Sequence, residues 1–507
     1  MDAETIGKTI LLLRKQKNLT QVQLAEQLNV SDKAISKWEQ GLSIPDFQQI
    51  DSLVKYFGIS YDNLFSGNVP DEPIANSQTS KIKRKKFNSK EWYKLDNAAK
   101  VYPPQANSDW SLVFRVSAVL KYPVDRQILQ NALEDIVDRF PTFMVTIKKG
   151  LFWYYFERME KVPMIVNGNR YPMRTIPLNG KHYLFRVTCE DKRIGLEVFH
   201  SITDGTGASI FLNTLLTRYY ELKYGAIEEH INAKNVFDNV KSGEVDDSFA
   251  RYSKKKNYAK RVMKSAYHVK GRKIKNNTVI QLITDATKLH DLAKKYGGTI
   301  TEFLTAIMAK SYFAKREYDK DTHPVIVQVP INLRKVFQSE TLRNFSLFCP
   351  IEFDDATLNT QALVDLAKEQ LARGIDKENL QQNINVNIRE ERNKIIRLAP
   401  LFLKNFGFSI ANKIYNVKSF STTISNLGNF SAPKELSAIV DRFDFILKEP
   451  PEGGTNFSVI SYNNKCVISM VRSIWEPDIE CEFVKLLVEE GLEFYVETNG
   501  GALNENL

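Results

Sequence analysis

A run of 24 residues, 67–90, divides the chain into parts that must fold around separate cores. Its first fourteen residues, GNVPDEPIANSQTS, contain Gly, two Pro, Asn, Ser and Thr but few large apolar side chains, a composition typical of linkers. Its last ten, KIKRKKFNSK, carry six Lys or Arg and no acid. Since 507 residues exceed what one core usually holds, we expect a domain at 1–66, a basic flexible linker at 67–90, and further domains after it.

The composition is that of an ordinary soluble protein. Hydrophobic residues make up 43% and charged residues 26%, which argues against disorder. No apolar run approaches the roughly 18 residues that a membrane span requires, and no signal-peptide pattern is present. The four cysteines are scattered without ligand spacing: Cys189, Cys349, Cys466 and Cys481. We therefore expect a cytoplasmic protein with reduced thiols, no membrane span, no metal site and no bound cofactor.

The net charge of +10 is unevenly distributed along the chain. Besides the basic end of the linker, residues 251–275 carry eleven Lys or Arg and no acid. These two segments supply more positive charge than the whole chain shows, so the remainder is net negative. Each basic segment is either a solvated connection or a surface that contacts phosphate groups.

Residues 19–41, LTQVQLAEQLNVSDKAISKWEQG, are typical of two helices joined by a sharp turn. Thr20 followed by Gln23 forms a capping box that starts the first helix. Asn29 stands where the chain turns, because Asn tolerates a left-handed conformation. Ser31 caps the next helix and Gly41 ends it.

This region, with helical patterns on both sides at 3–17 and 46–57, resembles the Cro/lambda-repressor family of helix-turn-helix domains. The resemblance covers residues 19–65 and implies an all-α, five-helix domain that binds double-stranded DNA. In that family the third helix enters the major groove. Carried over by position, the base-contacting residues are Asp32, Lys33 and Ser36, and the phosphate-contacting residues are Gln21 and Lys37.

The charge of this domain bears on how it binds. Residues 1–66 contain seven Lys or Arg against eight Asp or Glu, a net charge of −1. DNA affinity depends heavily on phosphate neutralisation, so one copy alone should bind weakly. We therefore expect a homodimer on a palindromic operator, aided by the basic residues 81–90.

From residue 91 onward, strand-like and helix-like segments alternate, which predicts an α/β architecture. Expected strands are 110–120, 182–190, 193–200, 278–284 and 324–334, and expected helices are 125–143, 209–225 and 287–316. We expect an N-terminal lobe at 91–250, the basic crossover at 251–275 and a C-terminal lobe at 276–507. A cleft between two lobes is a common place for a ligand.

A histidine lies at the end of one of these strands, in VFHSITDGTGAS, residues 198–209. Leu196 and Val198 belong to an apolar strand that delivers His200 to a turn, where Asp204 and Gly205 supply turn chemistry before a helix. A neutral imidazole, with a pKa near 6.5, can take a proton from a hydroxyl or amine at pH 7. The same residues also fit a histidine that only serves the turn.

Four segments in order resemble the chloramphenicol-acetyltransferase-like superfamily, which includes alcohol O-acetyltransferases, plant acyltransferases and condensation domains. They are FHSITDGTGA at 199–208, AKKYGGTITEFLTAIMAKSY at 293–312, VPINLRKVFQSETLRNFS at 329–346 and TTISNLGNF at 422–430. The resemblance implies an α/β two-lobed fold with a tunnel between the lobes. A thioester donor, acyl-CoA or an acyl-carrier thioester, would enter from one face and an alcohol or amine acceptor from the other.

The resemblance also assigns roles by position. His200 matches the general base, and Asp204 matches a carboxylate that points away from the reaction and pairs with an arginine, here Arg334. Gly205 matches the small residue that leaves the tunnel open. Asn426 or Ser425 would donate to the tetrahedral oxyanion.

Two departures narrow the choice within the superfamily. Condensation domains carry two adjacent histidines, and here Phe199 fills the first position. The tryptophan-containing motif of the plant enzymes is missing. Two functions stay open: a transcriptional regulator whose acyltransferase-like domain senses or acylates a small molecule, or an active O- or N-acyltransferase that the DNA-binding domain only localises or regulates.

Overall fold

The computed structural model describes residues 3–17, 19–28, 30–57, 59, 64–65, 67, 91–106, 111–254, 264–411, 417–450 and 453–499. The chain divides into two compact units, Met1–Lys86 and Phe87–Leu507. Apolar cores lie within each unit. The expected linker falls almost entirely outside the described residues, and so does most of the fifth helix expected after residue 57.

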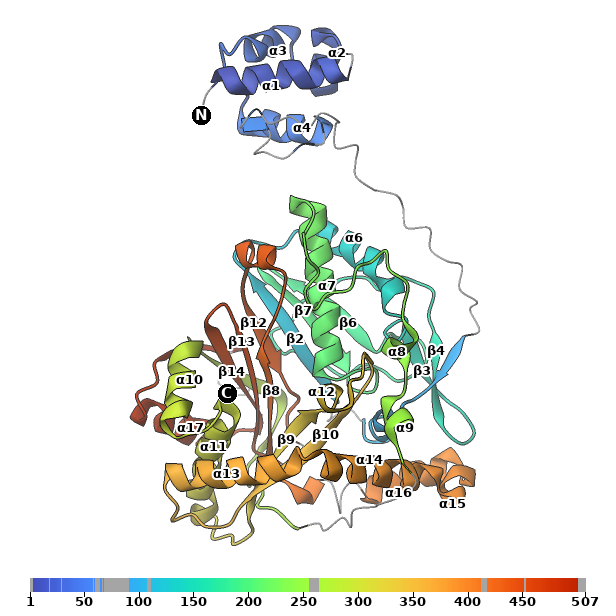
Figure 1. Ribbon diagram of the computed structural model, residues 1–507, viewed down its shortest axis with the longest axis vertical. Coiled ribbons are helices and arrows are strands. Elements are labelled where there is room, and N and C mark those ends of the chain that lie inside the picture. Colours follow the sequence, from blue (N-terminus) through green and yellow to red (C-terminus); the bar gives the residue numbers. More distant parts are fainter. Residues whose placement is uncertain are drawn as a thin grey trace. The chain divides into compact units, whose positions relative to one another are not determined.

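The first unit is helical. Its helices of known bounds are α1 (Ala3–Gln16), α2 (Gln21–Leu28), α3 (Asp32–Glu39) and α4 (Phe47–Phe57). They surround a core that includes Ile10, Leu24, Ile35, Trp38 and Leu53. Spacings of three and four residues place these apolar side chains on one face of each helix, and α1 to α4 pack as a small bundle (Figure 1).

Side-chain caps fix where the second and third helices begin. The backbone amide of Gln23 donates to Thr20 Oγ1 at 3.2 Å, and the amide of Thr20 donates to Gln23 Oε1 at 2.9 Å, which is the predicted capping box. Ser31 Oγ accepts from the amide of Ala34. Gly41, with φ at +68°, follows the end of α3. Asn29, the predicted turn residue, lies outside the described residues.

A five-stranded sheet, ordered β12-β2-β7-β6-β5, forms one half of the second unit (Figure 1). Its strands are β2 (Val113–Leu120), β5 (Val166–Asn167), β6 (Phe185–Glu190), β7 (Arg193–Phe199) and β12 (Val440–Ile446). Two helices, α6 (Arg126–Ile136) and α7 (Gly205–Tyr224), pack on it through apolar side chains. Strand β12 lies in the sequence range expected for the C-terminal lobe, but it pairs with β2 of the five-stranded sheet. Neither half of the unit is therefore one continuous segment of the chain.

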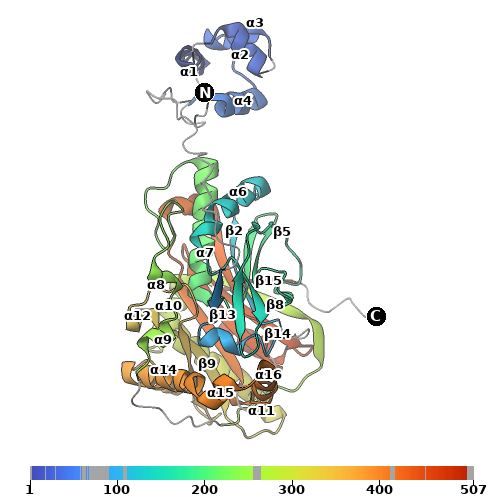
Figure 2. The same cartoon turned by 90° about the vertical axis from the view of Figure 1, so that its right-hand side faces the viewer.

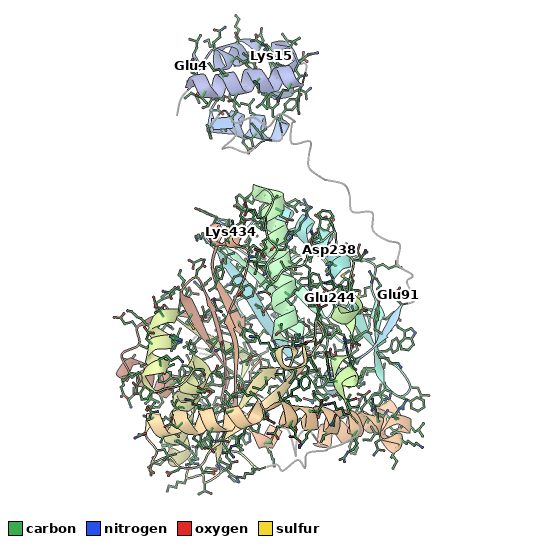
Figure 3. All side chains as sticks on the ribbon, in the orientation of Figure 1. Glu4, Lys15, Glu91, Asp238, Glu244 and Lys434 are labelled. Carbon is green, nitrogen blue, oxygen red and sulfur yellow. The ribbon has the colours of Figure 1, made fainter. Side chains whose placement is uncertain are left out.

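A small three-stranded sheet, ordered β1-β4-β3, lies beside this half. It contains β1 (Trp92–Lys94), β3 (Val145–Lys149) and β4 (Tyr154–Arg158). Two short helices follow α7 in the chain, α8 (Ser242–Val245) and α9 (Ser248–Tyr252). The buried Glu244, labelled in Figure 3, holds α8 in place because its carboxylate accepts two hydrogen bonds from Arg139, at 2.6 and 2.9 Å.

A seven-stranded sheet, ordered β10-β9-β11-β13-β14-β8-β15, forms the other half. Its strands are β8 (Lys273–Asp285), β9 (Val325–Asn332), β10 (Ser346–Phe353), β11 (Thr422–Asn429), β13 (Thr455–Tyr462), β14 (Lys465–Ile474) and β15 (Phe494–Thr498). Helices with apolar side chains in the same core are α10 (Ala286–Lys295), α11 (Ile300–Tyr318), α13 (Thr360–Gly374) and α17 (Asp478–Glu489). The short α12 (Arg334–Phe337) follows β9.

Three further helices run along one end of this unit, at its lower edge in both Figure 1 and Figure 2. They are α14 (Lys377–Arg392), α15 (Lys394–Leu398) and α16 (Leu401–Ala411). In the described part of the chain, no helix is both long and apolar enough to cross a membrane.

The prediction of one long helix over 287–316 is wrong, because the structure has two helices there, α10 and α11. Gly297 has φ at +65°, a left-handed conformation that ends α10. Thr299 then starts α11 through a capping box with Glu302. Part of the expected basic crossover, residues 255–263, lies outside the described residues.

Candidate functional site

Strand β7 delivers His200 into an aromatic cage at the point where the strand ends. The backbone amide of His200 donates to the carbonyl of Leu112 at 3.0 Å, which fixes the main chain. The Tyr102 ring stacks on the imidazole, with centroids 4.6 Å apart and planes 13° apart. Phe114 approaches from another side at 5.0 Å. The imidazole is thus half-buried and held in a single orientation.

Asn344 determines which nitrogen of the imidazole carries the proton. Its side-chain Nδ2 donates to the carbonyl of Ser201 at 3.3 Å, so its Oδ1 is the atom 3.2 Å from His200 Nδ1. An amide oxygen can only accept, which requires a proton on Nδ1 of the neutral ring. The lone pair is therefore on Nε2.

The environment also sets the charge of this histidine. Burial lowers the pKa of His200 below its ordinary value of 6.5, and this effect exceeds the upward influence of Asp204 and Asn344. The neighbouring Lys448 lowers the pKa of His200 further. At pH 7 the imidazole is consequently neutral, the form in which it can act as a base.

Asp204 is bonded into the fold through Arg334 and backbone amides. Its carboxylate forms a two-pronged ion pair with Arg334, at 2.9 and 3.0 Å. It also accepts from the backbone amide of Phe345 at 2.9 Å, and from the amides of Thr206 and Gly207 as the N-cap of α7. Asp204 therefore joins the first turn of α7 to the segment that follows α12.

The Arg334 guanidinium is equally well satisfied. Besides Asp204, it donates to the carbonyls of Thr341 and Arg343 and to Asn332 Oδ1. Burial alone would raise the pKa of Asp204, but Arg334 and the backbone amides lower it below the ordinary value of 3.8. The carboxylate is thus charged at neutral pH and serves the architecture of the loop.

Glycines let the loop after His200 pack closely. A Cβ at Gly205 would lie 2.8 Å from Leu427 Cδ2, the tip of a side chain on β11. A Cβ at Gly207 would lie 2.3 Å from the carbonyl oxygen of Leu342, which cannot move without shifting the main chain. Gly205 thus adjoins a mobile group, whereas Gly207 adjoins a fixed one.

The two candidates on β11 point to opposite faces of the large sheet. Asn426 Nδ2 donates to Thr301 Oγ1 at 3.1 Å, on the face covered by α11. Ser425 is one residue earlier and so faces the other way. It pairs with Ser458, whose hydroxyl donates to the carbonyl of Phe445 in β12. The structure therefore places Ser425, and not Asn426, on the face turned towards the five-stranded sheet.

Asn426 instead lines a hollow of about 340 Å³ at the end of β11. Ile300, Gly428 and Ser461 also line it. Among the described residues, no group of His, Cys, Asp and Glu side chains is placed to hold a metal ion.

The residues predicted to contact DNA lie on the surface of α2 and α3. Asp32, Lys33 and Lys37 are exposed, and Ser36 is half-buried on the same side of α3. Gln21 is half-buried, and its Nε2 donates to the Glu39 carboxylate at 2.7 Å. The α3 residues thus form one continuous face, while Gln21 is partly engaged within the unit.

Three residues of the His200 environment were missed by sequence reasoning: Asn344, Tyr102 and Phe114. Asn344 stands in the Asn-Phe pair of LRNFS, a segment the sequence had already singled out. Tyr102 lies nearly a hundred residues before the histidine in a segment without a motif, and only the fold brings the two rings together.

A helix-turn-helix family model matches residues 10–64. Over 55 residues, the chain is 53% identical to the HTH-type transcriptional activator BcrR of Enterococcus faecalis. That stretch is 11% of this chain and 27% of BcrR, so the chain spans about a quarter of the curated relative it matches. These findings confirm the predicted Cro/lambda-repressor type of helix-turn-helix domain at the N-terminus.

The second unit resembles solved condensation and acyltransferase structures. Polyketide synthase associated protein 5 from Mycobacterium tuberculosis matches with a TM-score of 0.56 and 13% identity, over 79% of this chain and 98% of that one. TRI101 of F. graminearum, complexed with coenzyme A and T-2 mycotoxin, matches with a TM-score of 0.54 and 12% identity, over 81% and 100%. The starter condensation domain of rhizomide synthetase RzmA, with C8-CoA and Leu-SNAC, gives 0.53 and 12%, over 79% and 94%. The predicted two-lobed α/β fold is confirmed.

Proposed function

We propose that the protein is a sequence-specific DNA-binding regulator whose second unit transfers an acyl group from a thioester to a hydroxyl or amine of a small molecule. The observation that carries the proposal is the state of His200. Its ring is neutral at pH 7, and Asn344 holds the proton on Nδ1. Nε2 is therefore the basic atom, and a neutral imidazole held in place is what a general base requires.

In the proposed reaction, Nε2 of His200 takes the proton of the acceptor hydroxyl or amine as that group attacks the thioester carbonyl. A C–O or C–N bond forms and the C–S bond breaks. The imidazolium then returns its proton to the departing thiolate, so the base is regenerated. Ser425, on the face turned towards the five-stranded sheet, is our candidate donor to the oxyanion in place of Asn426.

Asp204, Arg334 and Gly205 act as positioning residues in this proposal. The ion pair fixes the start of α7 and the segment after α12, and so holds the loop that carries His200. The donor class is supported by the relatives of the same fold that hold coenzyme A or C8-CoA. We propose acyl-CoA, or a carrier-bound thioester of the same chemistry, as the co-substrate rather than a resident cofactor.

The first unit would direct the protein to DNA in the cytoplasm. The exposed face of α3 is proposed to contact base edges through Asp32, Lys33 and Ser36, with Lys37 on a phosphate. Gln21 would contact a phosphate as well, after rotating away from Glu39. A homodimer on a palindrome would offset the net charge of −1 of residues 1–66.

The decisive experiment measures thiol release from acetyl-CoA and longer acyl-CoAs in the presence of small alcohols and amines. His200→Ala should lower the rate by about 10²–10⁴-fold. The matched control is His323→Ala, which removes an exposed histidine and should leave the rate unchanged. Turnover by His200→Ala at the wild-type rate would exclude His200 as the base.

Sensing without turnover is the second candidate, and the fusion to a DNA-binding domain favours it. Here the thioester would bind at His200 and alter operator affinity without losing its acyl group. The test is a DNA-binding titration with and without acyl-CoA, combined with thiol detection in the same sample. A change in DNA affinity without thiol release supports sensing, whereas thiol release that depends on His200 supports transfer.

A further inference from the structure

Helices α15 and α16 turn apolar side chains outwards. Those at least half exposed are Ile395, Leu398, Phe402, Leu403 and Phe406. Single exposed apolar residues are common on protein surfaces, but a contiguous group of this size marks a surface that is covered by something else. We call this group the apolar face.

The polarity of α16 is inverted relative to an ordinary surface helix. Lys404, the only charged residue of α16, is 7% exposed. Its ammonium donates to the carbonyls of Phe152 at 2.8 Å and Arg397 at 3.2 Å, and lies 3.6 Å from the centroid of the Trp153 ring. Burial and the neighbouring charge of Lys100 lower the pKa of Lys404. The helix thus buries its cation and exposes Phe402 and Phe406, the reverse of the pattern that water favours.

The loop between β3 and β4 extends the apolar face. Leu151 and Phe152 at its tip are both exposed. The amide of Leu401 donates to the carbonyl of Leu151 at 2.9 Å, which ties the loop to the start of α16. Two elements from distant parts of the sequence therefore contribute to one apolar surface.

Exposed charge beside this surface is predominantly positive, and Glu391, which directly precedes Arg392, is paired with Lys100. Residues 392–434 contain no Asp or Glu. Arg392, Lys394 and Arg397 flank the apolar side chains and are exposed, and Lys149 is exposed beside the loop. Helices that lie in a membrane interface combine an apolar face with flanking Lys and Arg in this way. We propose that the apolar face binds the surface of a membrane that contains anionic lipid.

The charge pattern favours lipid over a second copy of the chain. Two copies meeting through this face would bring the exposed cations of one, Arg392, Lys394 and Arg397, towards those of the other. Residues 392–434 contain no carboxylate to neutralise them, and the adjacent Glu391 is already paired with Lys100. An anionic lipid surface supplies the opposite charge as well as an apolar medium. Binding here would lay α15 and α16 in the interface and requires no membrane span.

The test is flotation of the full-length protein with vesicles of phosphatidylcholine alone or mixed with phosphatidylglycerol. Wild type should float with the mixed vesicles and far less with phosphatidylcholine. The double variant Phe402→Gln/Phe406→Gln should bind at least about tenfold more weakly, with an unchanged melting temperature because both side chains are exposed. The matched control Tyr318→Gln, at a 79% exposed aromatic residue, should bind like wild type.

The double variant retains every positive charge, including those of residues 81–90, so it separates the apolar face from attraction by charge alone. Mixed-vesicle binding that survives the double substitution would overturn the proposal, and so would failure of wild type to bind. Sedimentation velocity tests the second-copy alternative. A wild-type dimer that the double variant dissociates, without vesicle binding, would assign the face to self-association instead.

Discussion

Replacing Asp204 by alanine should destabilise the second unit severely, because it removes one partner of a buried ion pair. The substitution leaves the Arg334 guanidinium without its counter-charge, which typically costs about 3–5 kcal/mol. It also removes the N-cap of α7, worth about 1 kcal/mol. Together these give a loss of about 4–6 kcal/mol. The other acceptors of Arg334, such as the carbonyl of Thr341, keep the guanidinium hydrogen-bonded and favour the lower end.

The expected shift in melting temperature follows from the size of the unit. An unfolding entropy of about 2.1 cal/mol/K per residue, over roughly 420 residues, is about 0.9 kcal/mol/K. The loss of about 4–6 kcal/mol therefore lowers the melting temperature by about 4–7 °C, measurable by differential scanning calorimetry of the full chain. The control is Glu228→Gln, which breaks an ion pair with Lys434 whose side chains are 78% and 75% exposed. It should shift the transition by less than about 1 °C.

A mutant cycle and a pH series make the test specific. Asp204→Ala/Arg334→Met should lose less stability than the sum of the two single variants, because neither charge is left unpaired. The folded-state pKa of Asp204 is lowered, so its stabilisation is present above the ordinary pKa of 3.8 and is lost as pH falls through the lower folded value. The difference between wild type and Asp204→Ala should thus be constant from neutral pH down to about pH 5 and shrink below about pH 4. An Asp204→Ala transition within about 1 °C of wild type would refute the reasoning.

Three further predictions concern the surroundings of His200 and helix α3. Asn344→Asp should raise the pKa of His200, since it faces Nδ1 with a negative charge, and a pH–rate profile should show the acid limb displaced to higher pH. Gly207→Ala should lower the melting temperature by several degrees, because its Cβ would lie 2.3 Å from a carbonyl oxygen, whereas Gly205→Ala should melt near wild type; equal melting would contradict this. Lys37→Ala should weaken DNA binding equally across sequences and reduce the salt slope by about one unit per protomer, as a gel-shift salt series would show.

The sequence was sufficient for the helix-turn-helix because its information is local. Thr20, Gln23 and Ser31 each act on backbone amides within three residues, so the helix starts are legible without a tertiary structure. The single helix expected over 287–316 was wrong for a related reason. The apolar pattern continues across Gly297 and masks the break that its left-handed backbone makes.

The environment of His200 could be predicted only in part from the sequence, because its contacting residues are distant from it along the chain. The spacing of His200 and Asp204 is local, but Tyr102 and Asn344 reach the imidazole from opposite directions along the chain. The choice between Ser425 and Asn426 depended on which face of β11 is turned towards the five-stranded sheet. Strand alternation predicts that the two side chains lie on opposite faces, but it does not assign a face to either. The hydrogen bond from Asn426 to Thr301 makes that assignment.

The late position of β12 in the sequence delays completion of the five-stranded sheet during synthesis. The strand leaves the ribosome about 320 residues after β2, whose edge it covers, and at 5–20 residues per second that delay is roughly 15–65 s. The helix-turn-helix can fold within this interval because its core is local. The five-stranded sheet cannot be completed in this interval, because β12 has not yet been made. Meanwhile β2 presents an open edge and apolar side chains to neighbouring nascent chains. Production of the intact protein therefore depends on shielding a half-built sheet until its last strand arrives.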